Sequence, residues 1–140
     1  MDDDPVAAAQ WRHAVRRASG LVIGSPEYHG TFSGGLKNLL DYLDSNLVKG
    51  KPAALVAAAG SPRSGIGTLN TLRIVLRSLH MPVIVEQVAV CRSDMDVETG
   101  KWAADMRSCI SSMVDSLIGE IERRSYDQSR LQKKSDERQC

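Results

Sequence analysis

The sequence predicts an α/β fold in which a parallel sheet carries helices on both faces. Amphipathic helical stretches alternate along the chain with short apolar runs, which is typical of parallel strands joined by helical crossovers. The apolar runs at 21–24, 53–59 and 83–90 are rich in Leu, Val, Ile and Ala, as expected for buried strands. Two of these runs end in loops rich in Pro, Gly and Ser that lead toward a helix. An open α/β sheet presents its ligand loops in this way, at the carboxyl edge.

The helices follow from apolar residues at helical spacing. The first such stretch covers residues 6–19, and a second begins with the serine at 33 and covers 33–47. A third apolar stripe runs through 69–79 and ends before a proline. The last helix carries its apolar side over 102–121. Helices and strands therefore alternate from one end of the predicted domain to the other.

Composition limits the chain of 140 residues to one modest domain. The net charge of +1 provides no electrostatic footprint for nucleic acid or an anionic membrane, and no apolar run approaches the ~20 residues of a membrane span. The end of the chain is charged and lacks an apolar stripe, so we expect a domain over 1–124 and a disordered polar tail over 125–140.

Three scattered cysteines indicate neither a disulfide framework nor a zinc site, and no other metal-ligand spacing is present. We expect Cys109 to lie in the core and Cys91 to be more exposed, because Cys91 stands at a strand end. The acidic N-terminus is unlike a signal peptide. We therefore expect a cytoplasmic protein.

The segment Ser25-Pro26-Glu27-Tyr28-His29-Gly30 after the first strand is the strongest candidate for a binding loop. Pro26 removes a backbone donor and fixes φ, whereas Gly30 allows the backbone to approach a flat ligand closely. We expect the remaining amides, from Glu27 to Gly30, to point outward as free donors. Such a set of donors is suited to a binding site.

Together with the helix at 33–43 (SGGLKNLLDYL), this segment resembles the flavin loop of the NADPH-dependent FMN reductases. That family is flavodoxin-like and includes quinone, azo-dye and chromate reductases. The resemblance extends over the element order from Pro5 to about Arg124. Family members begin with a strand and a Gly-Ser-x-Arg-x-x-Ser phosphate loop, and nothing before Leu21 resembles it. The resemblance thus implies a flavodoxin-like sheet, N-terminally truncated, whose strands here are the third to fifth and whose first strand edge is open.

The resemblance also implies a reaction, in which hydride passes from NAD(P)H through FMN to a quinone-like or other small acceptor. The flavin performs the chemistry, so no residue is expected to be catalytic and no metal ligand is implied. The ring would be wrapped by one loop and bordered by a second, with Arg63 able to pair with a phosphate of the nicotinamide cofactor; these cofactor-binding residues are Pro26, Glu27, Tyr28, His29, Gly30, Gly60, Ser61 and Arg63. The family also implies a homodimer or homotetramer.

Other interpretations stay open at this point. Tyr28 could be a wedge between loop and helix, and His29 and Arg63 could be solvated side chains without a ligand. The chain could fold as a self-sufficient three-stranded domain, or act as a truncated, weakly catalytic or non-catalytic interaction module. It could also bind a nucleotide or phosphosugar through the loop 60–67. That loop has the G-x-x-x-x-G spacing of a P-loop, but Ile66 and Gly67 replace the required Lys and Ser/Thr.

Overall fold

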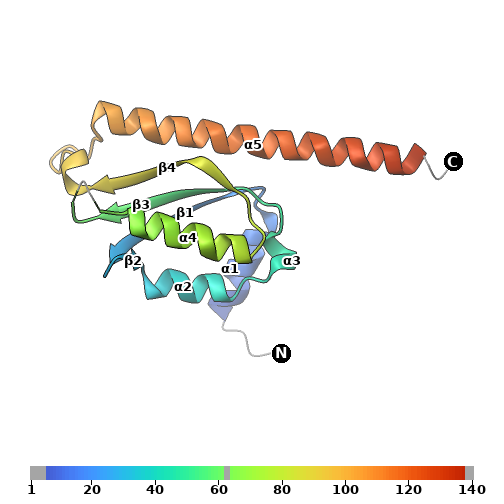
Figure 1. The fold of residues 1–140 in the computed structure, drawn as a ribbon, viewed down its shortest axis with the longest axis horizontal. Coiled ribbons are helices and arrows are strands. Elements are labelled where there is room, and N and C mark those ends of the chain that lie inside the picture. Colours follow the sequence, from blue (N-terminus) through green and yellow to red (C-terminus); the bar gives the residue numbers. More distant parts are fainter. Residues whose placement is uncertain (1–5, 62–63, 138–140) are drawn as a thin grey trace.

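A computed structural model describes residues 6–61 and 64–137 (Figure 1). It contains a mostly parallel sheet with helices on both faces, as the sequence predicts. The elements in chain order are α1 (Val6–Arg17), β1 (Leu21–Tyr28), β2 (Thr31–Phe32), α2 (Gly34–Asp41), α3 (Ser45–Val48), β3 (Ala53–Ala59), α4 (Ile66–Ser78), β4 (Val83–Cys91), a 3-10 turn (Arg92–Asp94) and α5 (Ala104–Glu137).

The sheet has the strand order β2-β1-β3-β4. β1 and β3 pair in parallel from Leu21↔Ala53 to Pro26↔Ala58, and β4 continues the parallel set on the other side of β3. This order agrees with third, fourth and fifth strands of a flavodoxin-like sheet. The short β2 is antiparallel to the end of β1, and the sequence did not predict it.

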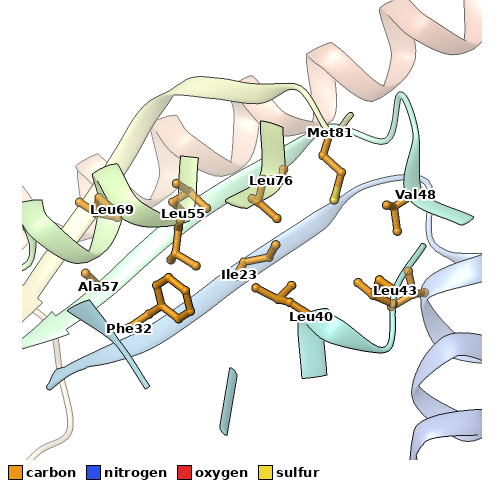
Figure 2. Packing of buried hydrophobic residues seen from close by; sticks show 13 residues of the cluster. Ile23, Phe32, Leu40, Leu43, Val48, Leu55, Ala57, Leu69, Leu76 and Met81 are labelled. Carbon is orange, nitrogen blue, oxygen red and sulfur yellow. The ribbon is translucent and has the colours of Figure 1, made fainter. Parts of the chain in front are cut away.

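Two apolar clusters lie on opposite faces of the sheet. The larger cluster includes Val15 from α1, Leu40 from α2 and Leu72 from α4, packed on the face that carries Ile23 and Leu55. Figure 2 shows side chains of this cluster converging from the helices and strands. The smaller cluster places α5 against β3 and β4 on the other face. The helices and the sheet therefore form a three-layer arrangement (Figure 1).

The end of the chain differs from the disordered tail predicted over 125–140, because α5 continues as a helix to Glu137; the last residues of that prediction, 138–140, lie outside the described residues. Ion pairs follow the surface of this helix near the end of the sheet. Arg123 and Arg124 both contact Glu120, and Arg123 also reaches Asp127, at i,i+3 and i,i+4 spacings. Figure 1 shows this part of α5 extending beyond the sheet.

The predicted helix over 33–47 is divided into α2 and α3. Asp44 ends the continuous run because its side chain accepts a hydrogen bond from the amide of Leu47 at 3.0 Å and caps α3. An aspartate in this position accepts a hydrogen bond from a free amide at the start of a new helix. The apolar stripe predicted from sequence therefore spans two helices with a break in the backbone between them.

The expectations for the cysteines are wrong. Cys91 is buried, with 7% of its surface exposed, whereas Cys109 is exposed. The buried stripe of α5 passes through Ile110 and Met113, and Cys109 lies beside this stripe rather than on it. Within the described ranges, no helix is both long and apolar enough to cross a membrane.

Candidate functional site

The two candidate loops meet at the carboxyl edge of the sheet. β1 ends at Tyr28 and β3 ends at Ala59, and because the strands are parallel their following segments emerge at the same edge. The contact is direct: a Cβ added to Gly67 would lie 2.6 Å from the carbonyl oxygen of Gly30. The start of α4 and the turn after β1 are therefore in close apposition.

The segment after β1 is a tight hairpin rather than an open loop. Glu27 and Tyr28 pair with β2, and the two connecting residues His29 and Gly30 have φ values of 53° and 82°. Positive φ at both central residues is what a type I′ hairpin turn requires. The hairpin is also anchored by the buried side chain of Phe32. Local turn chemistry thus overrides the loop that the sequence predicts here.

The sequence predicts free outward amides from Glu27 to Gly30, and the hairpin leaves fewer of them free. Glu27 and Tyr28 belong to β1 and its ladder with β2. Among the hydrogen bonds of the described residues, none is donated by the main-chain nitrogen of His29 or Gly30. Two amides at the tip of the hairpin are therefore available to a ligand.

Ser25 fastens the hairpin to the start of α2. Its hydroxyl donates to the carbonyl of Pro26 at 2.8 Å and accepts from the amide of Ser33 at 2.9 Å. Ser33 in turn caps α2 by accepting from the amide of Leu36 at 3.2 Å. Ser25 is only 4% exposed, so this pair of hydrogen bonds satisfies a buried hydroxyl and fixes the backbone on both sides of Pro26.

Glu27 directs its carboxylate to the start of α4. Its Oε2 atom accepts from the amide of Gly65 at 3.0 Å, from the hydroxyl of Thr68 at 3.1 Å and from the amide of Thr68 at 3.4 Å. The backbone hydrogen bond from Gly65 is the main cause that lowers the pKa of Glu27, the Thr68 donors add to it, and desolvation opposes it. A carboxylate held ionised in this way is a structural acceptor and a poor general acid.

The other candidate residues are exposed at this edge. Tyr28 is 60% exposed, which argues against a wedge role, and His29, Gly60 and Ser61 are also exposed. Apart from the adjacent residues in the chain, no atom of the described residues lies within 4 Å of a Cβ built on Gly30 or on Gly60. A flat ligand can therefore approach the backbone at both positions. Arg63, the proposed phosphate partner, lies outside the described residues.

Sequence reasoning missed Gly65, a sterically restricted position in the second loop. Gly65 has φ of 97°, and a Cβ there would lie 3.0 Å from Cβ of Ala89 and 3.3 Å from Cβ of Ala57. Gly65 is also the N-cap of α4 and, having no side chain, makes no side-chain capping hydrogen bond. The signal that could have identified it is a glycine directly before an amphipathic helix in a loop where parallel strands converge.

In the part of the chain that the structure describes, no three His, Cys, Asp or Glu side chains gather in a way that could hold a metal ion. The candidate site is instead made of exposed backbone, glycines and one tyrosine ring. Such a surface suits a flat organic ligand held by main-chain donors.

The sheet order and the helices on both faces of the sheet define a flavodoxin-like α/β domain. A family model described as NADPH-dependent FMN reductase matches residues 1–94, and the chain belongs to this family. The family resemblance given by residues 25–43 is thereby confirmed.

Two sequence relatives show how much of a family member the chain represents. It is 36% identical over 114 residues to an NADPH azoreductase from Bacillus sp. (strain OY1-2), covering 81% of this chain and 63% of that enzyme. It is 36% identical over 94 residues to an FMN-dependent NADPH-azoreductase from Staphylococcus haemolyticus, covering 67% of this chain and 50% of that enzyme. The chain thus spans between half and two thirds of the length of these relatives.

Solved structures agree on the fold. An oxidoreductase from Corynebacterium diphtheriae superimposes with a TM-score of 0.72 at 23% identity, covering 85% of this chain and 64% of that chain. The flavoenzyme NAD(P)H:(acceptor) oxidoreductase FerB from Paracoccus denitrificans gives a TM-score of 0.73 at 17% identity, covering 86% of this chain and 70% of that chain. At these identities the likeness establishes a common architecture.

Proposed function

We propose that this chain is an FMN reductase-type oxidoreductase domain that uses NAD(P)H and FMN to reduce small acceptors. The observation that carries the proposal is the apposition of the β1–β2 hairpin and the start of α4, which forms an open edge in a member of this family. The relatives from Bacillus and Staphylococcus are named as NADPH azoreductases, which supports azo compounds as one acceptor class. Quinone-like acceptors are the second class that we propose.

The residues present fit the isoalloxazine end of FMN. The free amides of His29 and Gly30 are suited to its polar pyrimidine edge, and the open backbone at Gly30 and Gly60 leaves room for a flat ring. The exposed ring of Tyr28 can pack beside it, and Arg63 is proposed to bind a phosphate of the nicotinamide cofactor. FMN, when bound, supplies the hydride relay, and the protein supplies orientation and main-chain donors.

Titration of the purified chain with FMN, followed by flavin fluorescence and absorbance, tests this proposal. We expect saturable binding and a large loss of affinity in Gly30→Val, because the side chain would occupy the open surface of the hairpin tip. Gly50→Val is the matched control, since Gly50 has a similar φ of 79°, also has open space at its Cβ, and lies before β3 at the opposite edge. Equal FMN affinity in wild type, Gly30→Val and Gly50→Val would contradict the site.

A weakly or non-catalytic interaction module is the second candidate. Within the described residues, the outer edge of β1 pairs only with β2, at Glu27 and Tyr28, and the edge from Leu21 to Pro26 is unpaired. Unpaired strand edges favour association with other chains. A colourless protein that does not bind FMN but associates in solution would support this candidate. A yellow protein that oxidises NAD(P)H in the presence of an acceptor would support the reductase.

We also propose that the domain forms a homodimer or homotetramer. α2 presents Lys37 and Asp41 on its exposed side, where they form an ion pair at 2.6 Å within the helix. Both side chains are about half exposed, so a partner surface could contact them without rearrangement of the core. Sedimentation velocity with and without FMN measures the assembly state and its dependence on the ligand.

A further inference from the structure

α4 begins without a capping side chain of its own. Its N-cap is Gly65, which provides no side-chain hydrogen bond to the first amides of the helix. The first amides of any helix lack partners within it, and Ser, Thr, Asp or Asn normally satisfies one of them. In this chain the acceptor comes from another element, because Oε2 of Glu27 takes the amides of Gly65 and Thr68.

Thr68 also contacts Glu27 through its side chain. Its side chain is fully buried, and its hydroxyl donates to the same Oε2 atom at 3.1 Å. A buried hydroxyl without a partner is costly, so Thr68 depends on the carboxylate of Glu27 for satisfaction. The carboxylate likewise gains three donors from one short segment, and a charge-assisted set of this kind is stronger than a neutral one.

A steric contact acts at the same place. Gly67 lies in the first turn of α4, and a Cβ built on it would approach the carbonyl oxygen of Gly30 to 2.6 Å and Oε2 of Glu27 to 3.8 Å. The atom in the way at Gly30 belongs to the backbone, so it cannot be moved aside by a rotamer change. The hairpin therefore sits at a distance from α4 that only glycine at this position permits.

We infer that Glu27 is a positioning residue, whose carboxylate locks the β1–β2 hairpin to the start of α4. Together with the close contact at Gly67, this lock sets the separation of the hairpin tip from the loop that follows β3. The consequence for the cofactor rests on the proposed function, since these two segments are the proposed borders of the flavin ring. Glu27 is one of the residues predicted from sequence to surround the ring, and its side chain faces α4.

Hydrogen exchange on the protein without FMN tests the lock directly. We expect the amides of Gly65 and Thr68 to exchange about three- to thirty-fold faster in Glu27→Ala, which corresponds to the loss of a helix cap. Glu27→Gln retains an oxygen acceptor without the charge, so we expect a smaller acceleration at the same amides. Glu86→Ala, at an exposed glutamate of β4, is the matched control and should leave them unchanged. Unchanged exchange in Glu27→Ala would overturn the inference.

A double-mutant cycle separates the lock from a general loss of stability. Thr68→Val keeps the shape of the buried side chain and removes the hydroxyl donor. We expect it to accelerate exchange in the wild-type background and to have less effect when Glu27 is already alanine. Additive effects would contradict a shared contact.

FMN affinity then links the lock to the site. We expect Glu27→Ala and Gly67→Ala each to weaken FMN binding about tenfold or more, with Glu27→Gln between them and wild type. Gly67→Ala displaces the hairpin but leaves Glu27 in place. If Glu27→Ala and Gly67→Ala both weaken FMN binding, the weaker binding is assigned to the changed separation of the two loops. If wild type binds no FMN while exchange responds as expected, the proposed function fails and the lock stands. If wild type binds FMN and neither variant changes the affinity, the positioning role is wrong.

Discussion

β1 and β3 are neighbouring parallel strands of one sheet, but only β3 is shielded on both of its faces. Ala54 and Leu55 are completely buried on opposite sides of β3. In β1, Ile23 is 5% exposed on the face covered by α4 and its neighbours, whereas Val22 is 56% exposed on the opposite face, where α5 packs mainly on β4 and β3. β3 is thus buried on both faces, whereas β1 is buried on one face and exposed on the other.

The two strands are held in the sheet by different kinds of contact. β3 pairs along both of its edges, so its position is determined by its neighbours and by two apolar clusters. β1 pairs with β3 from Leu21 to Pro26 and with the short β2 at its last two residues, and its end is also held by side-chain hydrogen bonds of Ser25 and Glu27. The strand that leads into the candidate site is therefore the one whose geometry can be changed by single polar substitutions.

The largest expected effect is in β3. Leu55→Ala removes a completely buried side chain from the larger cluster, which leaves a cavity between the sheet and the helices. We expect the free energy of unfolding to fall by about 2–5 kcal/mol. Urea denaturation followed by far-UV circular dichroism measures this loss. A loss below about 1 kcal/mol would mean that β3 is not the centre of the core.

The next effect is expected at the glycine that closes the second loop. Gly65→Ala combines a left-handed backbone with a methyl group 3.0 Å from Cβ of Ala89, so we expect a loss of about 1–3 kcal/mol. Gly60→Ala, in the same loop, meets open space and is the matched control. Denaturation midpoints of the two variants measure the difference. Equal midpoints would show that the loop adapts freely and does not fix the start of α4.

The elements that the sequence predicted well are those with a single dominant signal. Residues 53–59 form one uninterrupted apolar run and become β3 with the same bounds, because a strand buried on both faces has no polar positions. The hairpin at the end of β1 has no such signal. β2 contains two residues, and its turn depends on positive φ at a histidine, which sequence alone rarely indicates.

The candidate site was predictable at the level of loops and not at the level of contacts. Parallel strands place the segments after β1 and β3 at one edge, so their proximity follows from topology. The contact between Glu27 and Thr68 joins residues 41 positions apart, and no local pattern encodes it. The helix past Arg124 was missed because the sequence signal sought was an apolar stripe, whereas this part of α5 is polar and carries ion pairs such as Arg123–Asp127.

A pH dependence is expected from the polar anchor of β1. The pKa of Glu27 is lower in the folded chain than its ordinary value, so its contribution is fully present above about pH 4.5 and is lost as pH falls through the folded pKa. Asp96 and Glu120 also have lowered pKa values and act in the same direction. We therefore expect the stability gap between wild type and Glu27→Gln to shrink below about pH 4.5, measured by urea denaturation at several pH values. A gap that stays constant down to pH 3 would contradict an ionised anchor.

The smallest expected effect tests the exposed face of β1. Val22 and Val88 point to the same face of the sheet, but Val88 is only 4% exposed and belongs to the cluster under α5. Valine and threonine have nearly the same shape, so each Val→Thr change places a hydroxyl in its local environment with little change in packing. We expect Val22→Thr to stay within about 0.5 kcal/mol of wild type and Val88→Thr to cost about 1–3 kcal/mol, both measured by urea denaturation. If Val22→Thr is as costly as Val88→Thr, another surface covers β1 in solution, and self-association measured at several protein concentrations would identify a second copy of the chain as that surface.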